Sequence, residues 1–343
     1  MKKNHVKRSS VIDNTVRDLD FSGVILVKGE KEMMLESVHG FANRSEEIVN
    51  TFQTRFGIAS GCKLFTSIAI AQLVDKGMLT FQTRLKDCLD IDFPHFDESI
   101  TIHHLLTHSS GIPDYFDEAV MEYEEIWKEK PMYTVNQLQD FLPMFQYNSM
   151  MFTPGERFHY NNSGFIILGL IVEQQTGLEF SEYVEAEIFK RCDMKDSGYF
   201  SLDRLPKHTA VGYIDNEKDG TWRTNVYSIP IKGGADGGAY VTASDYLKLW
   251  EGLMSHKLLS EGTTKVLLTP HICEKDEEYY GYGIWIRKRN GEIYKYHVMG
   301  YDPGVSFHSS FYPKTGVKVV IPSNKEYGPY KVTLAIEEEW LMD

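Results

Sequence analysis

Residues 55–79 read RFGIASGCKLFTSIAIAQLVDKGML, and this stretch passes from a short apolar strand, predicted over 54–59, into a helix. Ser60 and Lys63 lie at the strand-to-helix joint, three residues apart and therefore neighbours on one helix face. A serine at a helix N-terminus, next to an amine that can take its proton, is a candidate nucleophile. The helix itself is predicted to bury one face, because apolar residues recur with helical period at Phe65, Ile68, Ala69, Leu73 and Val74.

The composition is that of an ordinary globular protein, with 42% hydrophobic and 25% charged residues in a chain of 343. A formal net charge of -13 argues against a nucleic-acid or anionic-membrane partner. The N-terminal segment 1–21 starts with basic residues but has no apolar run behind them, so no export signal is predicted. The longest apolar run, 164–172, is too short to span a bilayer. Four cysteines without a Cys-x-x-Cys pair are typical of reduced thiols, and we expect a cytoplasmic protein.

The predicted elements come in the order strands, helices, strands. A helix over residues about 9–19 and a hairpin over 21–40 come first, and the chain is helical and loop-rich from about 80 to 200. The strands then return as a meander over 279–324, whose first strand is predicted over 279–288. A helix closes the chain.

This order predicts an α/β (α+β) fold, with an antiparallel sheet flanked by helices and an inserted, mainly helical lobe. We expect residues 1–60 and 205–343 to form one discontinuous α/β domain. Residues 61–204 are then the helical lobe, and the active site lies between the two parts.

Ser60-Gly61-Cys62-Lys63 matches the pattern Ser-x-x-Lys, which by itself is weak evidence for an active serine. A second candidate segment is Tyr160-Asn161-Asn162, which lies just before a predicted buried helix. Its structural interpretation is a helix cap at Asn162 or Ser163, with Tyr160 a surface aromatic. Its functional interpretation is a phenol acting as general base, with an amide that holds a substrate carbonyl.

Two other patterns suggest chemistry less strongly. His103, His104 and His108 have no carboxylate or cysteine cluster beside them, so packing or capping is favoured over metal binding, and we expect neither metal nor cofactor. The triplet 314–316, Lys-Thr-Gly, is found in penicillin-recognising enzymes, but here it follows a proline between two strand-like runs and is predicted to be a hairpin turn.

Taken together, these segments resemble the serine β-lactamase-like family of class C β-lactamases, D-alanyl-D-alanine carboxypeptidases and related esterases. The resemblance runs through nearly the whole chain, from FSGVILV through the Ser60 helix and ITIHHLLTHSSGIPD to FTPGERFHYNNSGF, GGAYVTASDYLKL and GYDPGVSF. It implies that Ser60 is the acyl-accepting nucleophile, that Lys63 helps to withdraw its proton and that Tyr160 transfers protons. It also implies that Asn162 binds the substrate amide.

The resemblance further implies an oxyanion hole made by the backbone N–H of Ser60 and a second N–H on an edge strand. Relatives carry Lys-Thr-Gly or His-x-Gly on that strand, whereas residues 296–304 here read YHVMGYDPG. An alignment without a gap through Gly300 and Tyr301 gives Tyr301 as the second donor and places Val298, not His297, at the position of the cation. His297 then points away from the site, unless a β-bulge turns it inward.

We therefore expect a serine hydrolase that forms an acyl-enzyme on Ser60 and acts as an esterase or amidase on a small acyl substrate. The nearer alternative is a penicillin-recognising D-Ala-D-Ala carboxypeptidase or weak β-lactamase, and the more distant one is a non-catalytic scaffold with the same fold. Residues 115–152, rich in Tyr, Met and Phe, are expected either to form the rim of the pocket or to be lobe core and surface.

Overall fold

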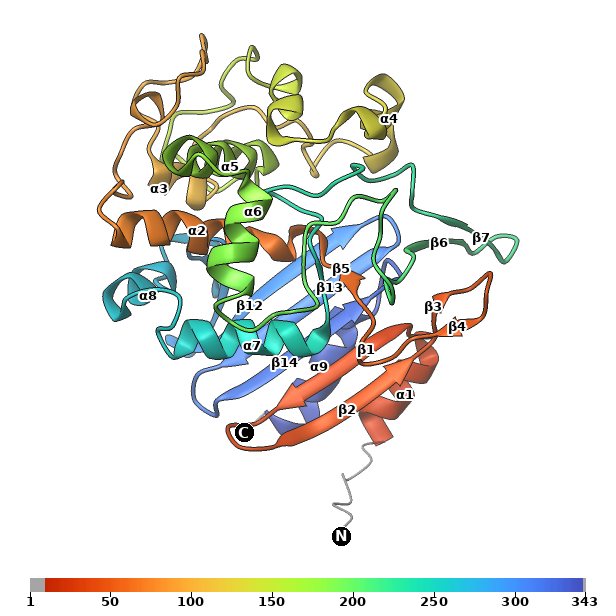
Figure 1. Cartoon of the computed structure of the whole chain (residues 1–343). Helices are drawn as coiled ribbons and strands as arrows, with labels where there is room; N and C mark the ends of the chain where they lie inside the picture. The colour runs from red at the N-terminus through yellow and green to blue at the C-terminus, as the bar shows by residue number, and fades with distance from the viewer. Residues whose placement is uncertain (1–9, 342–343) are drawn as a thin grey trace.

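The computed structural model describes residues 10–341, and the main element of this part of the chain is an antiparallel sheet of eight strands. The strands follow the order β2-β1-β14-β13-β12-β11-β10-β9 (Figure 1). Their bounds are β1 Gly23–Lys28, β2 Met33–His39, β9 Ile272–Lys275, β10 Glu278–Tyr280, β11 Trp285–Arg289, β12 Glu292–Asp302, β13 Val305–Tyr312 and β14 Val317–Ser323. The expected fold class, an antiparallel sheet with helices, is confirmed.

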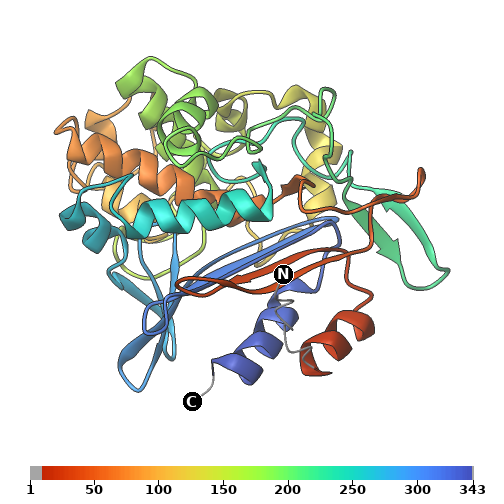
Figure 2. The same cartoon turned by 60° about the horizontal axis from the view of Figure 1, so that its bottom comes forward.

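Helices cover both faces of this sheet. They are α1 Ser10–Asp18, α2 Lys63–Asp75, α3 Ile102–Leu106, α4 Tyr123–Glu129, α5 Asn162–Thr176, α6 Phe180–Val184, α7 Ala243–Met254, α8 Glu261–Leu267 and α9 Pro329–Trp340. Helices α1 and α9 pack side by side on one face, and α2 and α7 lie over the other (Figure 2). The predicted N-terminal and C-terminal helices and the hairpin over 21–40 are therefore confirmed.

Strand β1 contributes to two hydrophobic cores on opposite sides of the sheet, because its side chains alternate between the two faces. Val24 and Leu26 face the larger core, which includes α2. Ile25 and Val27 face the smaller core under α1 and α9. A strand that is apolar on both sides is typical of the centre of a sheet covered on both faces, and β1 lies between β2 and β14.

Helix α2 is buried on all sides, so the expectation of a single buried face is wrong. Every residue from Lys63 to Leu73 is buried. The helix contacts α5, α6 and α8 and lies across the sheet, so its small and polar residues pack against neighbouring helices (Figure 1). The nucleophile candidate therefore starts the central helix of the molecule.

Two predicted strands differ from the observed ones. The strand expected over 54–59 is only β5, Phe56–Gly57, which pairs with β8, Tyr240–Val241, outside the main sheet. The strand expected over 279–288 is divided into β10 and β11, because Gly283 between them adopts a φ of +67°. A Cβ at Gly283 would lie 2.1 Å from Ser67 Oγ, so this bend lets the chain pass closely over α2.

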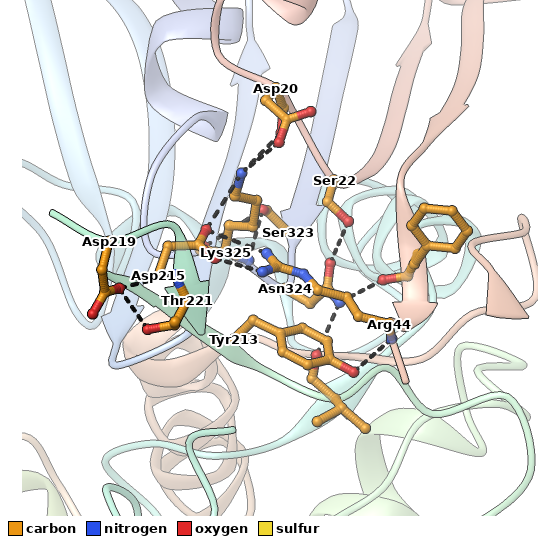
Figure 3. A network of polar contacts seen from close by, with 12 residues as sticks. Asp20, Ser22, Arg44, Tyr213, Asp215, Asp219, Thr221, Ser323, Asn324 and Lys325 are labelled. Carbon is orange, nitrogen blue, oxygen red and sulfur yellow. Dashed lines mark hydrogen bonds and ion pairs between the residues drawn. The ribbon is translucent and has the colours of Figure 1, made fainter. Parts of the chain in front are cut away.

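A polar network holds segments that are far apart in the sequence at one end of the sheet (Figure 3). The side-chain amide of Asn324, just after β14, donates to the carbonyl oxygens of Phe41 and Val211, at 2.9 Å each. Arg44 follows β3, Phe41–Asn43, which pairs with β4, Ile48–Val49; Arg44 forms an ion pair with Asp215. Asp215 lies on β6, Tyr213–Asn216, which forms a hairpin with β7, Thr221–Thr224. Both peripheral hairpins are thereby joined to the end of β14.

Within residues 10–341, no helix is both long enough and apolar enough to cross a membrane. Residues 1–9 of the N-terminal segment 1–21, on which the prediction of no export signal depends, lie outside the described residues, and residue 9 of the first predicted helix is among them. The division into a discontinuous domain of residues 1–60 and 205–343 and a lobe of residues 61–204 stays a prediction.

Helix α9 is fixed to the sheet by a buried ion pair. Lys295 Nζ on β12 lies 2.8 Å from Glu337 Oε1 on α9, and the Tyr312 hydroxyl donates to the same oxygen at 2.6 Å. The side chains of the two charged residues are 6% and 2% exposed. Removing one partner of such a pair leaves an uncompensated charge inside the protein.

We expect Lys295→Ala to lower the free energy of unfolding by about 3 kcal/mol, because Glu337 would lose its closest cation. Urea unfolding followed by circular dichroism measures this change. The matched control is Lys331→Ala, which removes an exposed lysine on α9, the helix that contains Glu337, and should leave stability almost unchanged. Equal effects of the two substitutions would contradict the role of the ion pair.

Candidate active site

Ser60 lies in a short 3-10 helix, η1 Ala59–Cys62, between β5 and α2. The residue before it, Ala59, is buried and adopts a φ of 44°, a left-handed conformation that is costly for a residue with a side chain. This sharp turn ends the strand and leaves Ser60 half-buried at the start of the central helix. Backbone strain of this kind often marks functional sites, where the surrounding packing maintains it.

Lys63 is 1% exposed, and its ammonium group is held by three oxygen atoms. Its Nζ donates to Ser60 Oγ at 2.9 Å, to Asn162 Oδ1 at 2.8 Å and to the backbone carbonyl of Asp236 at 2.7 Å. An ammonium group has three N–H donors, so each has a partner. The contact with Ser60 Oγ is the geometry needed for proton transfer between serine and lysine.

Tyr160 lies next to this pair. Lys63 Nζ is 4.9 Å from the centre of the Tyr160 ring, and the ring packs against His108 at 4.4 Å between centroids. Burial raises the pKa of Tyr160 well above its ordinary value, the nearby Glu118 raises it further, and a hydrogen bond with Ser60 opposes both effects. Before reaction the Tyr160 side chain is therefore a neutral phenol, which can donate its proton during proton transfer.

His108 supports the turn that carries Tyr160. Its Nδ1 accepts the backbone N–H of Asn161 at 3.0 Å. Burial lowers the pKa of His108 well below its ordinary value, and the charge of Lys63 lowers it further. A neutral imidazole with Nδ1 as acceptor fits this contact. The sequence predicted a packing or capping role for His108 in preference to metal binding, but its contact with Asn161 could not be read from the chain.

Asn162 is the first residue of α5, and it is not the helix cap. The cap is Asn161, whose Oδ1 accepts the N–H of Gly164 at 2.7 Å, so the structural interpretation with Asn162 or Ser163 as the cap is wrong. The amide of Asn162 is thereby free to hold Lys63 through Oδ1. Its Nδ2 donates to the Phe116 carbonyl at 3.2 Å. The amide thus joins α2 to the loop that contains Phe116.

Gly300 lies where β12 passes closest to Ser60. Strand β11 pairs with β12 only as far as Trp285 and His297, so the outer edge of β12 is open beyond that point, and η1 packs there. A Cβ on Gly300 would lie 2.0 Å from the Ile58 carbonyl oxygen and 2.9 Å from Ser60 N. Any side chain at this position would separate the strand from the nucleophile.

The orientation of Tyr301 follows from one hydrogen bond. Its carbonyl oxygen accepts the hydroxyl of Tyr123 at 2.7 Å, so this carbonyl points away from β13. In an extended strand the N–H and C=O of one residue point to the same side, so the Tyr301 N–H also faces the open edge. The Ser60 N lies beside Gly300, and the Tyr301 N–H comes next along the same strand edge, so the two predicted donors of the oxyanion hole lie in the same region. Their role stays a prediction.

His297 lies on the opposite face of the sheet from Ser60. The pairing of β12 with β13 is continuous from Tyr296 to Asp302, so no bulge turns His297 inward. Its ring is stacked between Trp285 and His308, at 6.4 Å and 5.4 Å between centroids, and is 4% exposed. The expectation that His297 points away from the site is confirmed. Val298 faces the larger core instead.

The other two patterns are also located. Lys314-Thr315-Gly316 forms the turn between β13 and β14, at the end of β13 remote from the cavity-lining Val305. Thr101 is the N-cap of α3, and the His104 side chain accepts the backbone N–H of Thr101 in a capping box. His103 Nδ1 contacts the Tyr282 hydroxyl at 2.9 Å. Among residues 10–341 no group of three or more His, Cys, Asp and Glu side chains is arranged to hold a metal ion.

A cavity opens in front of Ser60, which is one of its lining residues. Part of its wall comes from the segment 115–152, which sequence reasoning left as either pocket rim or lobe core. The structure supports the first interpretation for the aromatic and apolar residues Tyr115, Phe116, Tyr123, Ile126, Trp127 and Phe141. The glycine-rich residues 233–238 and the chain around 228–231 also contribute to the wall.

Three acidic residues that sequence reasoning missed also line this cavity: Glu118, Asp236 and Asp302. Burial raises the pKa of Asp302 to about 8, with further increases from Asp236 and Glu118. Burial also raises the pKa of Asp236 and of Glu118. The sequence could have indicated two of these three residues as part of the site. Asp236 interrupts a glycine-rich run, and Asp302 directly follows Tyr301, which was already a site candidate. Glu118 had no such signal.

A model of the Beta-lactamase family matches residues 10–339. The chain belongs to the beta-lactamase family. This family comprises serine hydrolases, which agrees with the Ser60–Lys63 pair.

Among solved structures, a penicillin binding protein from Bacillus halodurans is 56% identical, with a TM-score of 0.92 over 95% of this chain and 99% of that one. An octameric penicillin-binding protein homologue from Pyrococcus abyssi is 26% identical, with a TM-score of 0.83 over 98% and 77% of the two chains. "Penicillin-binding protein 4*" of Bacillus subtilis is 25% identical over 308 residues, which cover 85% of this chain and 65% of that protein. The chain thus spans about two thirds of that relative.

We expect Gly300→Ala to lower the rate of 4-nitrophenyl acetate hydrolysis by on the order of 100-fold, because the new methyl group displaces β12 from Ser60 and separates the two N–H donors. The control is Gly262→Ala on α8, where the nearest atom to a new Cβ is 4.0 Å away. Wild-type turnover in Gly300→Ala would contradict the prediction that this edge forms the oxyanion hole.

His297→Asn is expected to leave 4-nitrophenyl acetate hydrolysis unchanged while lowering the melting temperature, because the ring packs on the α9 side of the sheet. Both quantities are measured on the same preparation, at a temperature where circular dichroism shows the variant to be folded. A loss of turnover in the folded variant would mean that His297 reaches the site.

Proposed function

We propose that the protein is a serine hydrolase that forms an acyl-enzyme on Ser60, with esterase or amidase activity on small acyl substrates. The observation that carries this proposal is the 2.9 Å contact between Lys63 Nζ and Ser60 Oγ beside the open edge at Gly300. The catalytic residues are Ser60, Lys63 and Tyr160, and the substrate is held by Asn162, Gly300 and Tyr301.

In the proposed reaction, Lys63 acts as a neutral amine, after its ammonium group has released one proton to solvent. Ser60 Oγ then attacks the acyl carbon while Lys63 Nζ takes the hydroxyl proton. The N–H groups of Ser60 and Tyr301 stabilise the oxyanion of the tetrahedral intermediate. When the intermediate collapses, the bond to the leaving alcohol or amine breaks, and Tyr160 passes the proton to the leaving group. Water then attacks the acyl-Ser60 ester through the same groups in reverse, which releases the acid and restores the serine.

The charges of the cavity bear on the substrate. Among the residues that line it there is no Lys or Arg, while Glu118, Asp236 and Asp302 are acidic. His297, the nearest candidate cation on β12, faces the other side of the sheet. A free carboxylate on the substrate would therefore have no partner, which favours neutral or cationic esters and amides over β-lactams and D-Ala-D-Ala peptides.

A second candidate is a penicillin-recognising carboxypeptidase or weak β-lactamase. The observation in its favour is the 56% identity to a protein described as a penicillin binding protein, over nearly the full length of both chains. The two candidates share Ser60 as nucleophile and differ in how well the cavity accepts the carboxylate of a penicillin.

Labelling with a fluorophosphonate and, separately, with a fluorescent penicillin tests both candidates. We expect the fluorophosphonate to modify Ser60, identified by mass spectrometry of the peptide, and the penicillin to react slowly or not at all. Ser60→Ala should abolish labelling, whereas the matched control Ser67→Ala, seven residues further on in α2, should not.

Rapid labelling of Ser60 by both reagents would favour the penicillin-recognising enzyme. Absence of any adduct on the folded protein would favour a scaffold without catalytic activity. The Ser67→Ala control, whose Oγ has no hydrogen-bond partner, separates loss of the nucleophile from loss of the fold.

A further inference from the structure

We propose that this site selects substrates that carry a positive charge, namely small esters or amides with an ammonium group, and that Asp302 is the principal counter-charge. The inference rests on the proposed acyl-enzyme function and specifies its substrate class. It arises from the same cavity that contains Ser60, so the acidic residues are the walls of a reaction site and not an isolated cluster.

Three separate segments bring carboxyl groups to this cavity. Glu118 comes from the loop before α4, Asp236 from the loop before β8 and Asp302 from the end of β12. Asp236 and Glu118 each lie close enough to Asp302 to raise the Asp302 pKa by charge repulsion. The acids thus face a common space next to the nucleophile.

The three carboxyl groups differ in their partners. Asp236 accepts the hydroxyl of Tyr115, and Glu118 Oε1 lies 3.4 Å from Asn162 Nδ2. The carboxyl group of Asp302 has neither a hydrogen bond nor an ion pair within the part of the chain that the structure describes. It is the acid most available to a ligand.

Within residues 10–341, the cation that acts on these acids is Lys63, and it does not neutralise them directly. Lys63 directs its three N–H donors to the Ser60 hydroxyl, the Asn162 amide and the backbone carbonyl of Asp236, not to a carboxylate. Three acids against one lysine leave the cavity with an excess of potential negative charge. Asp236 is buried and Asp302 is half-buried, so negative charge on these two groups is costly unless they are protonated or a cation enters, whereas Glu118 is exposed.

The remaining walls suit the substituents of an ammonium group. Aromatic rings of Tyr123, Trp127 and Tyr115 line the same cavity, and aromatic faces attract cations as well as apolar groups. An anionic substrate would meet three acidic groups in the same space and be repelled. Charge and wall chemistry therefore favour the same class of ligand.

Two pairs of esters of matched shape test the proposal. For a charge on the leaving group, acetylthiocholine is compared with S-(3,3-dimethylbutyl) thioacetate. For a charge on the acyl group, 4-nitrophenyl 4-(trimethylammonio)butanoate is compared with 4-nitrophenyl 5,5-dimethylhexanoate. In each pair a carbon atom replaces the charged nitrogen, so the ratio of kcat/KM within a pair reports the effect of charge alone.

We expect at least one pair to give a ratio of about tenfold or more in favour of the cation, and Asp302→Asn to remove most of that preference. The matched control Asp90→Asn removes an exposed acid outside the cavity and should keep the wild-type ratio. Ratios near or below one for both pairs would overturn the proposal, as would a preference that survives both Asp302→Asn and Glu118→Gln.

The preference should also depend on pH in a defined direction. A carboxyl group whose pKa is raised to about 8 becomes ionised as the pH rises through that value, and the quaternary ammonium charge does not change. The ratio should therefore increase between about pH 7 and pH 9 in the wild type and stay flat in Asp302→Asn. The charged groups facing Asp302 are Asp236, Glu118 and Lys63, and the phenols of Tyr123 and Tyr240 lie nearby.

Failure of this inference is distinguishable from failure of the proposed function. If neutral esters are hydrolysed by the wild type and not by Ser60→Ala, the acyl-enzyme proposal is supported. This holds whatever the ratio of kcat/KM between the cationic and neutral esters. If no ester is hydrolysed, calorimetric binding of butyltrimethylammonium to the wild type and to Asp302→Asn decides the matter. Binding that is lost in Asp302→Asn supports the cation site, and absence of binding to the wild type refutes it.

Discussion

The buried ammonium group of Lys63 connects three parts of the chain that are far apart in the sequence. Its three hydrogen bonds reach Ser60 at the start of α2, Asn162 at the start of α5 and the backbone of Asp236 in a glycine-rich loop. A charge that is 1% exposed must have all its donors satisfied, so these segments have to meet at one point. The turn at Ala59, the cap at Asn161 and the path of the glycine-rich loop all serve this geometry.

The edge of β12 imposes the second constraint. The strand comes so close to the backbone of Ser60 that Gly300 has no room for a Cβ. Because β11 stops pairing at His297, the N–H and C=O groups of the following residues are free for other contacts. One of them, the Tyr301 carbonyl, is occupied by the hydroxyl of Tyr123. The same open edge therefore receives both the nucleophile and a residue from the cavity wall.

Family membership and cavity chemistry inform different questions. The match over residues 10–339 establishes the fold and the serine hydrolase family. The lining of the cavity, with three acids and no lysine or arginine, concerns the substrate, and it differs from what a carboxylate-bearing ligand requires. Specificity can change with a few side chains on loops, such as Glu118 and Asp236, while the nucleophile and its helix stay the same.

The sequence by itself determined the order of the elements and the position of Ser60 and Lys63 at a strand-to-helix joint, because these depend on local periodicity and spacing. The orientation of His297 followed from strand alternation only after the family resemblance had placed Gly300 and Tyr301 at the site. Tertiary structure decided what the spacing leaves open. It broke the strand expected over 279–288 at Gly283, buried α2 on every side and assigned the α5 cap to Asn161. It also gathered Glu118, Asp236 and Asp302 around one cavity. Their charges interact through space between segments far apart in the chain, and no local pattern in the sequence encodes that distance.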